Sequence, residues 1–243
     1  MPEAAPFAFN SDADVRLARI GRRGIKVSLI DNVLHDPQGV AALGFAETYA
    51  EDRSNLYPGF RAPMPGAFSA GFRAWLTPVL QQNRVLEEDQ TIVRDTSFFS
   101  VVATASKDLL PIQCIPHYDA TDPNLFAAVI YLCDTRFGGT AFYRHRRTGY
   151  EEITAATVDN YQLALNSDMR IHGVPKKEYI AGDNALFEAI FETEMRFNSA
   201  VVYPARIIHA ARIEKGFDRP KDQTGWRLTV TALLHVASRW GAP

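Results

Sequence analysis

The sequence predicts an α+β fold, in which helices come first and a core of two packed β-sheets follows. Two textures along the 243 residues indicate this fold. Residues 1–92 read mainly as helical support, whereas residues 93–243 read as short strands separated by turn residues. No linker rich in Pro, Ser or Gly separates the two parts, so we expect a single domain over residues 1–243.

Two helices are expected in the first part. Asp36 and Pro37 read as an N-cap and a first helical residue, and the run VAALGFAETYAED follows them. A loop with three prolines comes next, over Tyr57–Gly66. The segment AFSAGFRAWL then predicts a second helix, which we expect Pro78 to bend or end.

The second part contains a series of short segments that are rich in β-branched and aromatic residues. They are Thr96–Ser106, Asn124–Leu132, Gly139–His145, Arg196–Pro204, Ala205–Ile213 and Trp226–Val236. Repeated Gly, Pro and Asp residues between them favour an antiparallel sandwich or barrel over alternating βαβ units. One helical pattern, over residues 156–165, interrupts the series.

Composition and charge exclude several classes of protein. The chain is 47% hydrophobic and 22% charged, which is typical of a globular protein, and its net charge of −2 shows no footprint for nucleic acid or an anionic membrane. The longest apolar run, Leu125 to Cys133, is far shorter than the roughly 20 residues of a membrane helix. The N-terminus does not read as a secretory signal, and the two cysteines, Cys114 and Cys133, favour a reducing cytoplasm. The oligomeric state is left open, a homodimer included.

The histidines are the informative feature for function. His117 stands two residues before Asp119 in PHYD, and in an extended segment such residues point to the same side. An imidazole and a carboxylate would then lie together, as two neighbouring metal ligands do. The pair alone is a weak signal, because chance gives about 0.4 such matches in a chain of this composition.

Two further residues lie in apolar strands downstream. His209 in ARIIHAARI reads either as a buried core histidine or as a second imidazole for a non-haem Fe(II) site, which takes two imidazoles and one carboxylate. Arg227 in GWRLTVTALL shares a strand face with Thr229. A buried arginine requires a partner, so Arg227 either binds a carboxylate with the help of the Thr229 hydroxyl or forms a structural ion pair at the sheet rim.

The order of PHYD, AVIYLCD, FGGTAFY, VVYPARIIHA and GWRLTVTALL resembles the core of the Fe(II)- and 2-oxoglutarate-dependent oxygenases, in particular their prolyl 4-hydroxylase-like branch. The longer string FGGTAFYRHRRTGYE also resembles a bacterial family of unknown function that is grouped near this superfamily. The resemblance covers residues 96–236.

This resemblance implies a double-stranded β-helix (jelly-roll) core with the N-terminal helices packed on one sheet. It implies hydroxylation of a C–H bond in a small molecule or amino-acid side chain, with release of succinate and CO₂. By position, it implies that His117, Asp119 and His209 are the iron ligands. Arg227 would bind the distal carboxylate of 2-oxoglutarate, with Thr229 as its helper. Gly138 and Gly139 would form a turn beside the cofactor.

Two departures from the branch leave its finer features open. The segment LLPIQCI before His117 lacks the tyrosine often found there in prolyl hydroxylases, which leaves the second cofactor contact unassigned. The insertion GFDRPKDQT lengthens the spacing from His209 to Arg227. Both departures argue against a peptidyl-proline substrate.

Other readings of these segments remain open. The site could belong to a catalytically inactive jelly-roll module that binds a metal or an acid, or to a zinc hydrolase-like protein, since the same donors suit Zn²⁺. The run YRHRRTG reads as a cationic lip for an anionic substrate or as a solvated hairpin end, and residues 52–66 as a lid or a plain connection. Cys114, close to His117, reads as buried strand packing or as a thiolate ligand. Phe98, Phe99 and Tyr131 read as core.

Overall fold

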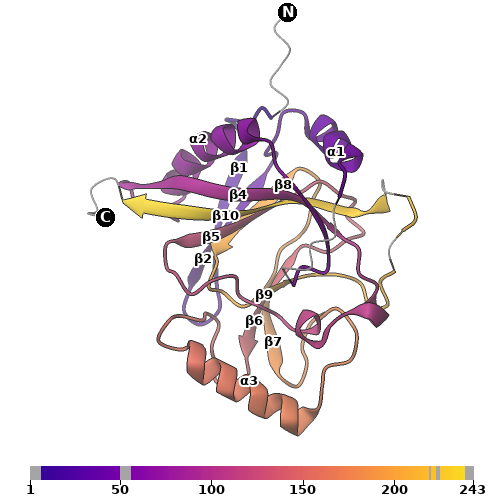
Figure 1. The fold of residues 1–243 in the computed structure, drawn as a ribbon. Helices are drawn as coiled ribbons and strands as arrows, with labels where there is room; N and C mark the ends of the chain where they lie inside the picture. The colour runs from indigo at the N-terminus through magenta and orange to yellow at the C-terminus, as the bar shows by residue number, and fades with distance from the viewer. Residues whose placement is uncertain (1–6, 50–55, 219, 223–224, 239–243) are drawn as a thin grey trace, which may run out of the picture.

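The computed structural model describes residues 7–49, 56–218, 220–222 and 225–238, which form two antiparallel β-sheets and three α-helices (Figure 1). The larger sheet has the strand order β1-β2-β8-β5-β10-β4-β3, and the smaller sheet has the order β7-β6-β9. The larger sheet contains β1 (Asp14–Ile20), β2 (Ile25–Asp31), β3 (Gly59–Pro63), β4 (Gln90–Val102), β5 (Leu125–Tyr131), β8 (Ser199–Pro204) and β10 (Arg227–Ser238). The smaller sheet contains β6 (Thr140–His145), β7 (Phe187–Glu192) and β9 (His209–Ala211). The predicted antiparallel arrangement is therefore confirmed.

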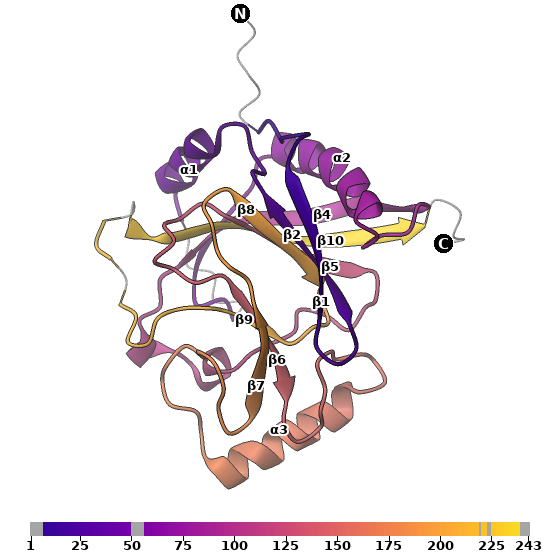
Figure 2. The ribbon, with the colours of Figure 1, turned by 180° about the vertical axis from the view of Figure 1, so that it is seen from behind.

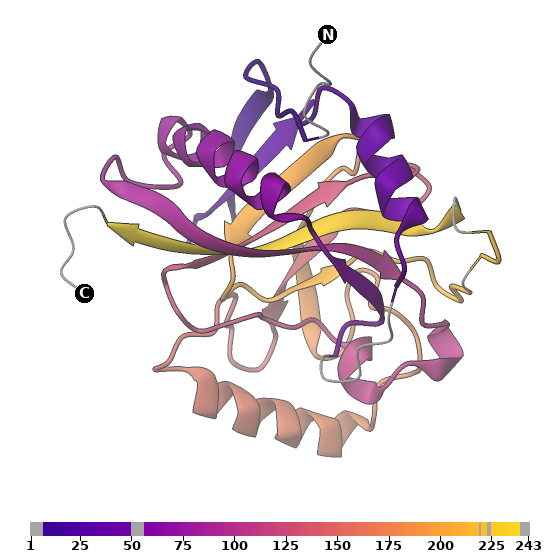
Figure 3. The same cartoon turned by 45° about the horizontal axis from the view of Figure 1, so that its top comes forward.

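The helices lie on the outside of the two sheets, as Figures 1 and 3 show. Helices α1 (Pro37–Ala46) and α2 (Gly66–Gln82) cover one face of the larger sheet, and Phe68 and Phe72 of α2 join one apolar cluster with Phe99 of β4. Helix α3 (Val158–His172) lies against the smaller sheet, where its Tyr161 packs with Phe187 of β7. The expected packing of the N-terminal helices on one sheet is thus observed.

The other face of the larger sheet looks toward the smaller sheet. Thr229 of β10 lies opposite Ser100 of β4 and Tyr131 of β5, and Ser100 lies opposite Arg61 of β3. Directly opposite residues of an antiparallel pair share a face, so these four side chains point to the same side. Tyr131 packs there against Phe142 of β6. We call this side the inner face.

From β4 onward the chain alternates between the two sheets. It leaves β4 for the segment around His117, which pairs with β9, and then returns to the larger sheet as β5. Strands β6 and β7 belong to the smaller sheet, β8 to the larger, β9 to the smaller and β10 to the larger. This path brings residues from distant parts of the sequence together between the sheets.

The N-terminal part is less helical than the sequence predicts. Strands β1 and β2 form a hairpin that pairs through β2 with β8, as the view from behind in Figure 2 shows. Only β2 has a buried side for the core, whereas β1 lies at the sheet edge and is half exposed, so its apolar pattern is weak. The Tyr57–Gly66 segment is likewise not only a loop, since β3 within it pairs with β4. Residues 52–55, part of the tract read as a lid or a connection, lie outside the described residues.

The predicted helices are present, with different ends. The Asp36 side chain accepts a hydrogen bond from the Gly39 N–H at 2.9 Å, so it caps α1 as expected. Helix α2 does not end at Pro78 but continues to Gln82, because Leu76 and Leu80 are fully buried against the larger sheet and this burial outweighs the lost backbone bond. Strand β7 was not expected. None of the helices in the described ranges is long and apolar enough to span a membrane.

Candidate metal centre

His117 and His209 are held side by side by backbone pairing. The His117 N–H donates to the His209 carbonyl at 2.9 Å, and the His209 N–H donates to the His117 carbonyl at 2.7 Å. The Asp119 N–H donates to the Ala205 carbonyl at 2.8 Å, so residues 117–119 run extended along the chain that leads into β9. The expected i, i+2 arrangement therefore places the His117 and Asp119 side chains together, beside His209.

The three side chains converge on one point. The Nε2 atom of His117 lies 3.5 Å from Oδ1 of Asp119, and the Nε2 atom of His209 lies 3.7 Å from Oδ2 of Asp119. One donor atom from each residue lies within 4.8 Å of the other two. Donors bound at about 2.1 Å from a common ion lie roughly 3 Å apart, so a small inward movement would complete such a site. Two imidazoles and one carboxylate form the donor set that suits non-haem Fe(II), with further positions left open.

The protonation states also suit a cation. The Nδ1 atom of His209 lies 2.9 Å from the Ile207 carbonyl, which fixes the proton on Nδ1 and leaves the Nε2 lone pair facing the site. Burial lowers the pKa of His209 to about 4. Burial opposes the ionisation of Asp119, but the two neighbouring imidazoles outweigh it and hold the Asp119 pKa at about 2. At neutral pH His209 is therefore neutral and Asp119 ionised, as a divalent metal requires.

The site has one open side. The side chain of His117 is 54% exposed and that of Asp119 is 31% exposed, whereas that of His209 is only 6% exposed. His209 packs edge-on against the ring of Tyr203, with ring centroids 4.7 Å apart. A metal held here would be fixed from within by His209 and open to solvent beyond His117.

Arg227 and Thr229 lie on the inner face of β10 and are both buried. Among the described residues, the Arg227 guanidinium donates only to the carbonyls of Gly138 and Gly139, at 3.2–3.4 Å. Its carbon lies 5.7 Å from the centre of the Tyr131 ring. Over the part of the chain that the structure describes, no carboxylate lies within 4 Å of it. The structural ion pair considered from the sequence is therefore absent from those residues.

At Gly138 and Gly139 the backbone passes very close to the backbone of Arg212 and Thr193. A Cβ atom on Gly139 would lie 2.4 Å from the Thr193 carbonyl oxygen, and one on Gly138 would lie 2.8 Å from the Arg212 carbonyl oxygen. Neither contact leaves room for a side chain, so only glycine fits at both positions. The two glycines set the carbonyls that hold Arg227.

Tyr57 is a site residue that sequence reasoning missed. Its buried hydroxyl lies beside the Thr229 side chain, within the field of Arg227, and burial raises its pKa. A phenol therefore stands next to the arginine, although none precedes His117 in LLPIQCI. Tyr57, Gly59 and Arg61 stand at every second position, so in an extended segment they share one side. The three prolines of the segment obscured this signal.

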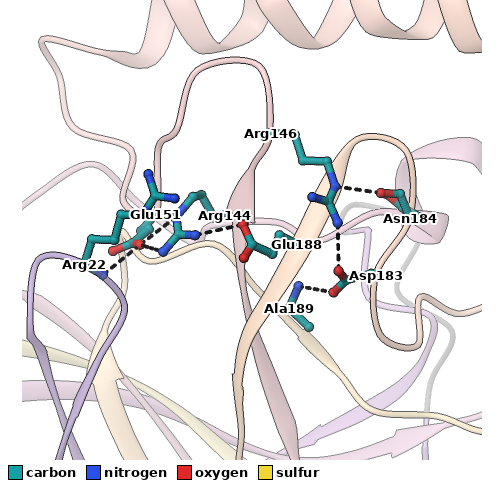
Figure 4. A network of polar contacts seen from close by, with 8 residues as sticks. All are labelled: Arg22, Arg144, Arg146, Glu151, Asp183, Asn184, Glu188 and Ala189. Carbon is teal, nitrogen blue, oxygen red and sulfur yellow. Dashed lines mark hydrogen bonds and ion pairs between the residues drawn. The ribbon is translucent and has the colours of Figure 1, made fainter.

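The run YRHRRTG does not form a cationic lip. Arg144 donates to Glu151 at 2.9 Å and to Glu188 at 2.8 Å, as Figure 4 shows. In the same view Arg146 donates to Asp183. His145 and Arg147 both contact Asp168 of α3, at 3.0 and 2.6 Å. These side chains therefore join β6 and the turn after it to β7, α3 and neighbouring loops. Of the predicted hairpin end, only the turn after Arg147 is observed.

The Arg144–Glu151 pair gives a stability prediction. Glu151→Gln is expected to lower the free energy of unfolding by about 2–3 kcal/mol at pH 7, because among the described residues Arg144 then keeps only the half-exposed Glu188 as an acidic partner. Burial opposes the ionisation of Glu151, but the Arg22 N–H and the Arg144 guanidinium outweigh it and hold its pKa below the usual value. The stabilisation is therefore complete above about pH 4.3 and is lost as the pH falls through the lowered pKa.

Urea unfolding of the wild type and of Glu151→Gln, at pH 7 and at about pH 3, tests this prediction. The difference between their free energies of unfolding should shrink at the lower pH. Glu188→Gln, which removes the more exposed partner of the same arginine, is the matched control. It should lower the free energy of unfolding by less than Glu151→Gln does. Equal stabilities of Glu151→Gln and the wild type at pH 7 would contradict the prediction.

Neither cysteine belongs to the described group of His117, Asp119 and His209. Cys114 and Cys133 are both free and buried. Cys114 lies in a short 3₁₀ turn over Pro111–Cys114, not in a strand, and its thiol donates to the Leu110 carbonyl. Burial raises its pKa, which disfavours the thiolate that a metal would need.

Comparisons with known proteins place the chain in a family. A search of curated protein sequences gives no match. HygX from Streptomyces hygroscopicus, solved with nickel and 2-oxoglutarate, is 12% identical with a TM-score of 0.45, covering 86% of this chain and 82% of its own. A Pseudomonas putida prolyl-4-hydroxylase is 13% identical with a TM-score of 0.45, covering 86% and 91%. The carbocyclase SnoK from nogalamycin biosynthesis is 12% identical with a TM-score of 0.47, covering 90% and 84%. TM-scores in this range do not establish a common fold. A family model does match residues 11–234, so the chain belongs to the family of unknown function DUF6445.

Proposed function

We propose that this protein is an Fe(II)- and 2-oxoglutarate-dependent oxygenase. The observation that carries the proposal is the convergence of His117, Asp119 and His209 at one point. A second feature supports it: the buried Arg227 lies on the inner face with no acidic partner among the described residues. The sequence resemblance over residues 96–236 agrees with both.

We also infer that the β-core is a double-stranded β-helix. From β4 the chain supplies eight strand-like segments, if the His117 segment is counted as the partner of β9. The larger sheet then contains the order β8-β5-β10-β4, and the smaller contains β7-β6-β9 with the His117 segment at its edge. Two facing sheets that share one winding chain in this manner are what a jelly roll requires.

The chain's own residues have distinct tasks in this proposal. His117, Asp119 and His209 would hold the iron through two imidazoles and one carboxylate. Arg227 would bind the distal carboxylate of 2-oxoglutarate with its planar fork, and the hydroxyls of Thr229 and Tyr57 lie beside it. Bound there, iron and the 2-oxo acid would supply the oxidation of an unreactive C–H bond. Burial of Tyr131 and Tyr203 keeps their phenols protonated, as donors that face the interior.

The substrate in this proposal is a small molecule or an amino-acid side chain, and we expect neither nucleic acid nor membrane as a partner. We expect the protein in the cytoplasm, where its two free thiols would stay reduced. A zinc hydrolase-like site would use the same three donors. Arg227 favours the oxygenase, because hydrolysis at zinc needs no second carboxylate in the site.

The proposal is tested by adding Fe(II) and 2-oxoglutarate to the metal-free protein without oxygen. We expect a weak visible band near about 500 nm, as the metal–2-oxo acid chelate gives, and slow release of succinate once oxygen is admitted. His117→Ala, which removes an exposed ligand with little effect on the core, should abolish both signals. A folded wild-type protein that binds the metal but shows neither signal would overturn the proposal in favour of a binding module or a hydrolase.

A further inference from the structure

Arg61 lies on the inner face at the edge of the larger sheet. It is opposite Ser100, which is opposite Thr229, so the three side chains form one row across β3, β4 and β10. Its guanidinium carbon lies 4.4 Å from the centre of the Tyr57 ring and 5.6 Å from that of Phe98. The two rings hold the guanidinium in place without occupying its hydrogen-bonding edge.

The Arg61 side chain has no polar partner among the described residues. Its Nε atom is buried and makes no hydrogen bond, and none of the described carboxylates forms an ion pair with the guanidinium. Two other arginines of the described residues differ, since Arg73 pairs with Asp95 and Arg144 with Glu151. A buried N–H without an acceptor is rare and costs free energy, so an unfilled one in a candidate site points to a ligand.

Arg61 also lies within electrostatic range of the candidate metal centre. Its guanidinium covers the ring of Tyr57, and its charge acts on both Asp119 and Tyr57. Arg61 and Arg227 therefore both place a cationic group on the inner face of the larger sheet. Gly59, on the same strand, secures this arrangement, because a Cβ atom there would lie 1.9 Å from the Val101 carbonyl oxygen and would push β3 away.

The charges of the proposed site leave Arg61 without a counterpart. A divalent iron and Arg227 together carry three positive charges, and Asp119 with the dicarboxylate 2-oxoglutarate carries three negative ones. Arg61 adds one positive charge in a partly buried position. A single further anion would neutralise it, and buried charges are stable when they are paired in this way.

We propose that Arg61 binds a carboxylate of the substrate, so that the protein acts on an organic acid. This inference rests on the proposed function and narrows its substrate class. The planar guanidinium, held between two rings, matches a carboxylate through two parallel N–H donors. Arg227 takes the co-substrate, and Arg61 orients the substrate beside the metal.

The test uses the protein loaded with Ni(II) and saturating 2-oxoglutarate, so that nothing turns over. The probes are aliphatic, aromatic and α-amino carboxylic acids, each paired with its primary amide, and binding is measured by calorimetry. We expect at least one acid to bind about 10- to 100-fold more tightly than its amide. Arg61→Gln should remove that preference and leave the affinities for Ni(II) and 2-oxoglutarate unchanged.

Arg19→Gln is the matched control, because it removes one exposed arginine from β1 and should keep the preference. Arg61→Lys keeps the charge and loses the planar fork, so it should retain only part of the preference for the acid. It replaces Arg61→Gln in the test if that variant does not fold. The inference is overturned if the wild type prefers no acid over its amide, or if Arg61→Gln keeps that preference. It is also overturned if Arg61→Gln lowers the affinity for 2-oxoglutarate rather than the preference for the acid. Failure of the oxygenase proposal would show separately, as a wild type that does not bind the metal or 2-oxoglutarate.

Discussion

His209→Ala is expected to lower the affinity for a divalent metal by more than about 100-fold and to abolish 2-oxoglutarate-dependent succinate release. Changes beyond the direct ligands of metal sites already lower metal affinity about 10- to 100-fold, and His209 is the candidate ligand that the fold places most rigidly. Its Nδ1–H is bound by the Ile207 carbonyl, its ring is packed against Tyr203, and its backbone pairs with His117. Calorimetric titration with Ni(II), and with Fe(II) without oxygen, measures the loss.

Two further variants separate ligand loss from unfolding. Asp119→Asn keeps the shape of the side chain but removes the negative charge, so it should weaken metal binding without a cavity in the core. His172→Ala removes an exposed histidine at the end of α3 and should leave metal binding unchanged. A folded His209→Ala or Asp119→Asn protein with wild-type metal affinity would show that the three side chains are not a metal site.

The candidate ligand residues could be singled out from the sequence because each stands in a short pattern. His117 and Asp119 are two residues apart in an extended segment, and His209 interrupts an apolar strand. Arg227 was identified in the same way, as a charged residue within an apolar strand. Such local irregularities survive in the sequence whatever the strand pairs with, and the structure brings the residues that carry them to the same region.

The positions of Arg61 and Tyr57 could not be predicted from the sequence because they depend on strand register. Three prolines mark their segment as a loop, yet Pro58 and Pro63 flank or end an edge strand, where a missing N–H is tolerated. Only the pairing of β3 with β4 turns Arg61 toward the inner face. Nothing in YPGFRAPMPG itself reports that partner.

The basic run at Arg144–Arg147 shows the same difficulty in reverse. Four cationic or titratable residues in sequence suggest an exposed binding surface, but their acidic partners come from separate elements. Glu188 lies on β7 and Asp168 on α3, so the partners are invisible until the chain is folded. A charge pattern along one segment thus carries little information about function when the tertiary partners are unknown.

Arg227→Gln is expected to raise the dissociation constant for 2-oxoglutarate by about 100- to 1,000-fold and to leave the metal affinity unchanged. Removing one partner of a buried, hydrogen-bonded charge pair commonly costs 2–5 kcal/mol, which corresponds to a change of this order. Arg227→Lys keeps the charge but loses the fork, so its affinity should lie between those of the wild type and Arg227→Gln. Anaerobic titration of the Fe(II)-loaded proteins with 2-oxoglutarate, followed at the visible band, gives the three constants.

The measurement also decides between the two roles that a buried arginine can have. If Arg227 served only to hold the Gly138 and Gly139 carbonyls, Arg227→Gln would lower the thermal midpoint but leave 2-oxoglutarate binding intact. If Arg227 binds the co-substrate, the affinity falls while the metal titration matches the wild type. The His209 variant, by contrast, should lose both ligands, because in the proposed site the 2-oxo acid would depend on the bound metal as well as on Arg227. Only an oxygenase-type site predicts that one variant loses both and the other loses only the acid.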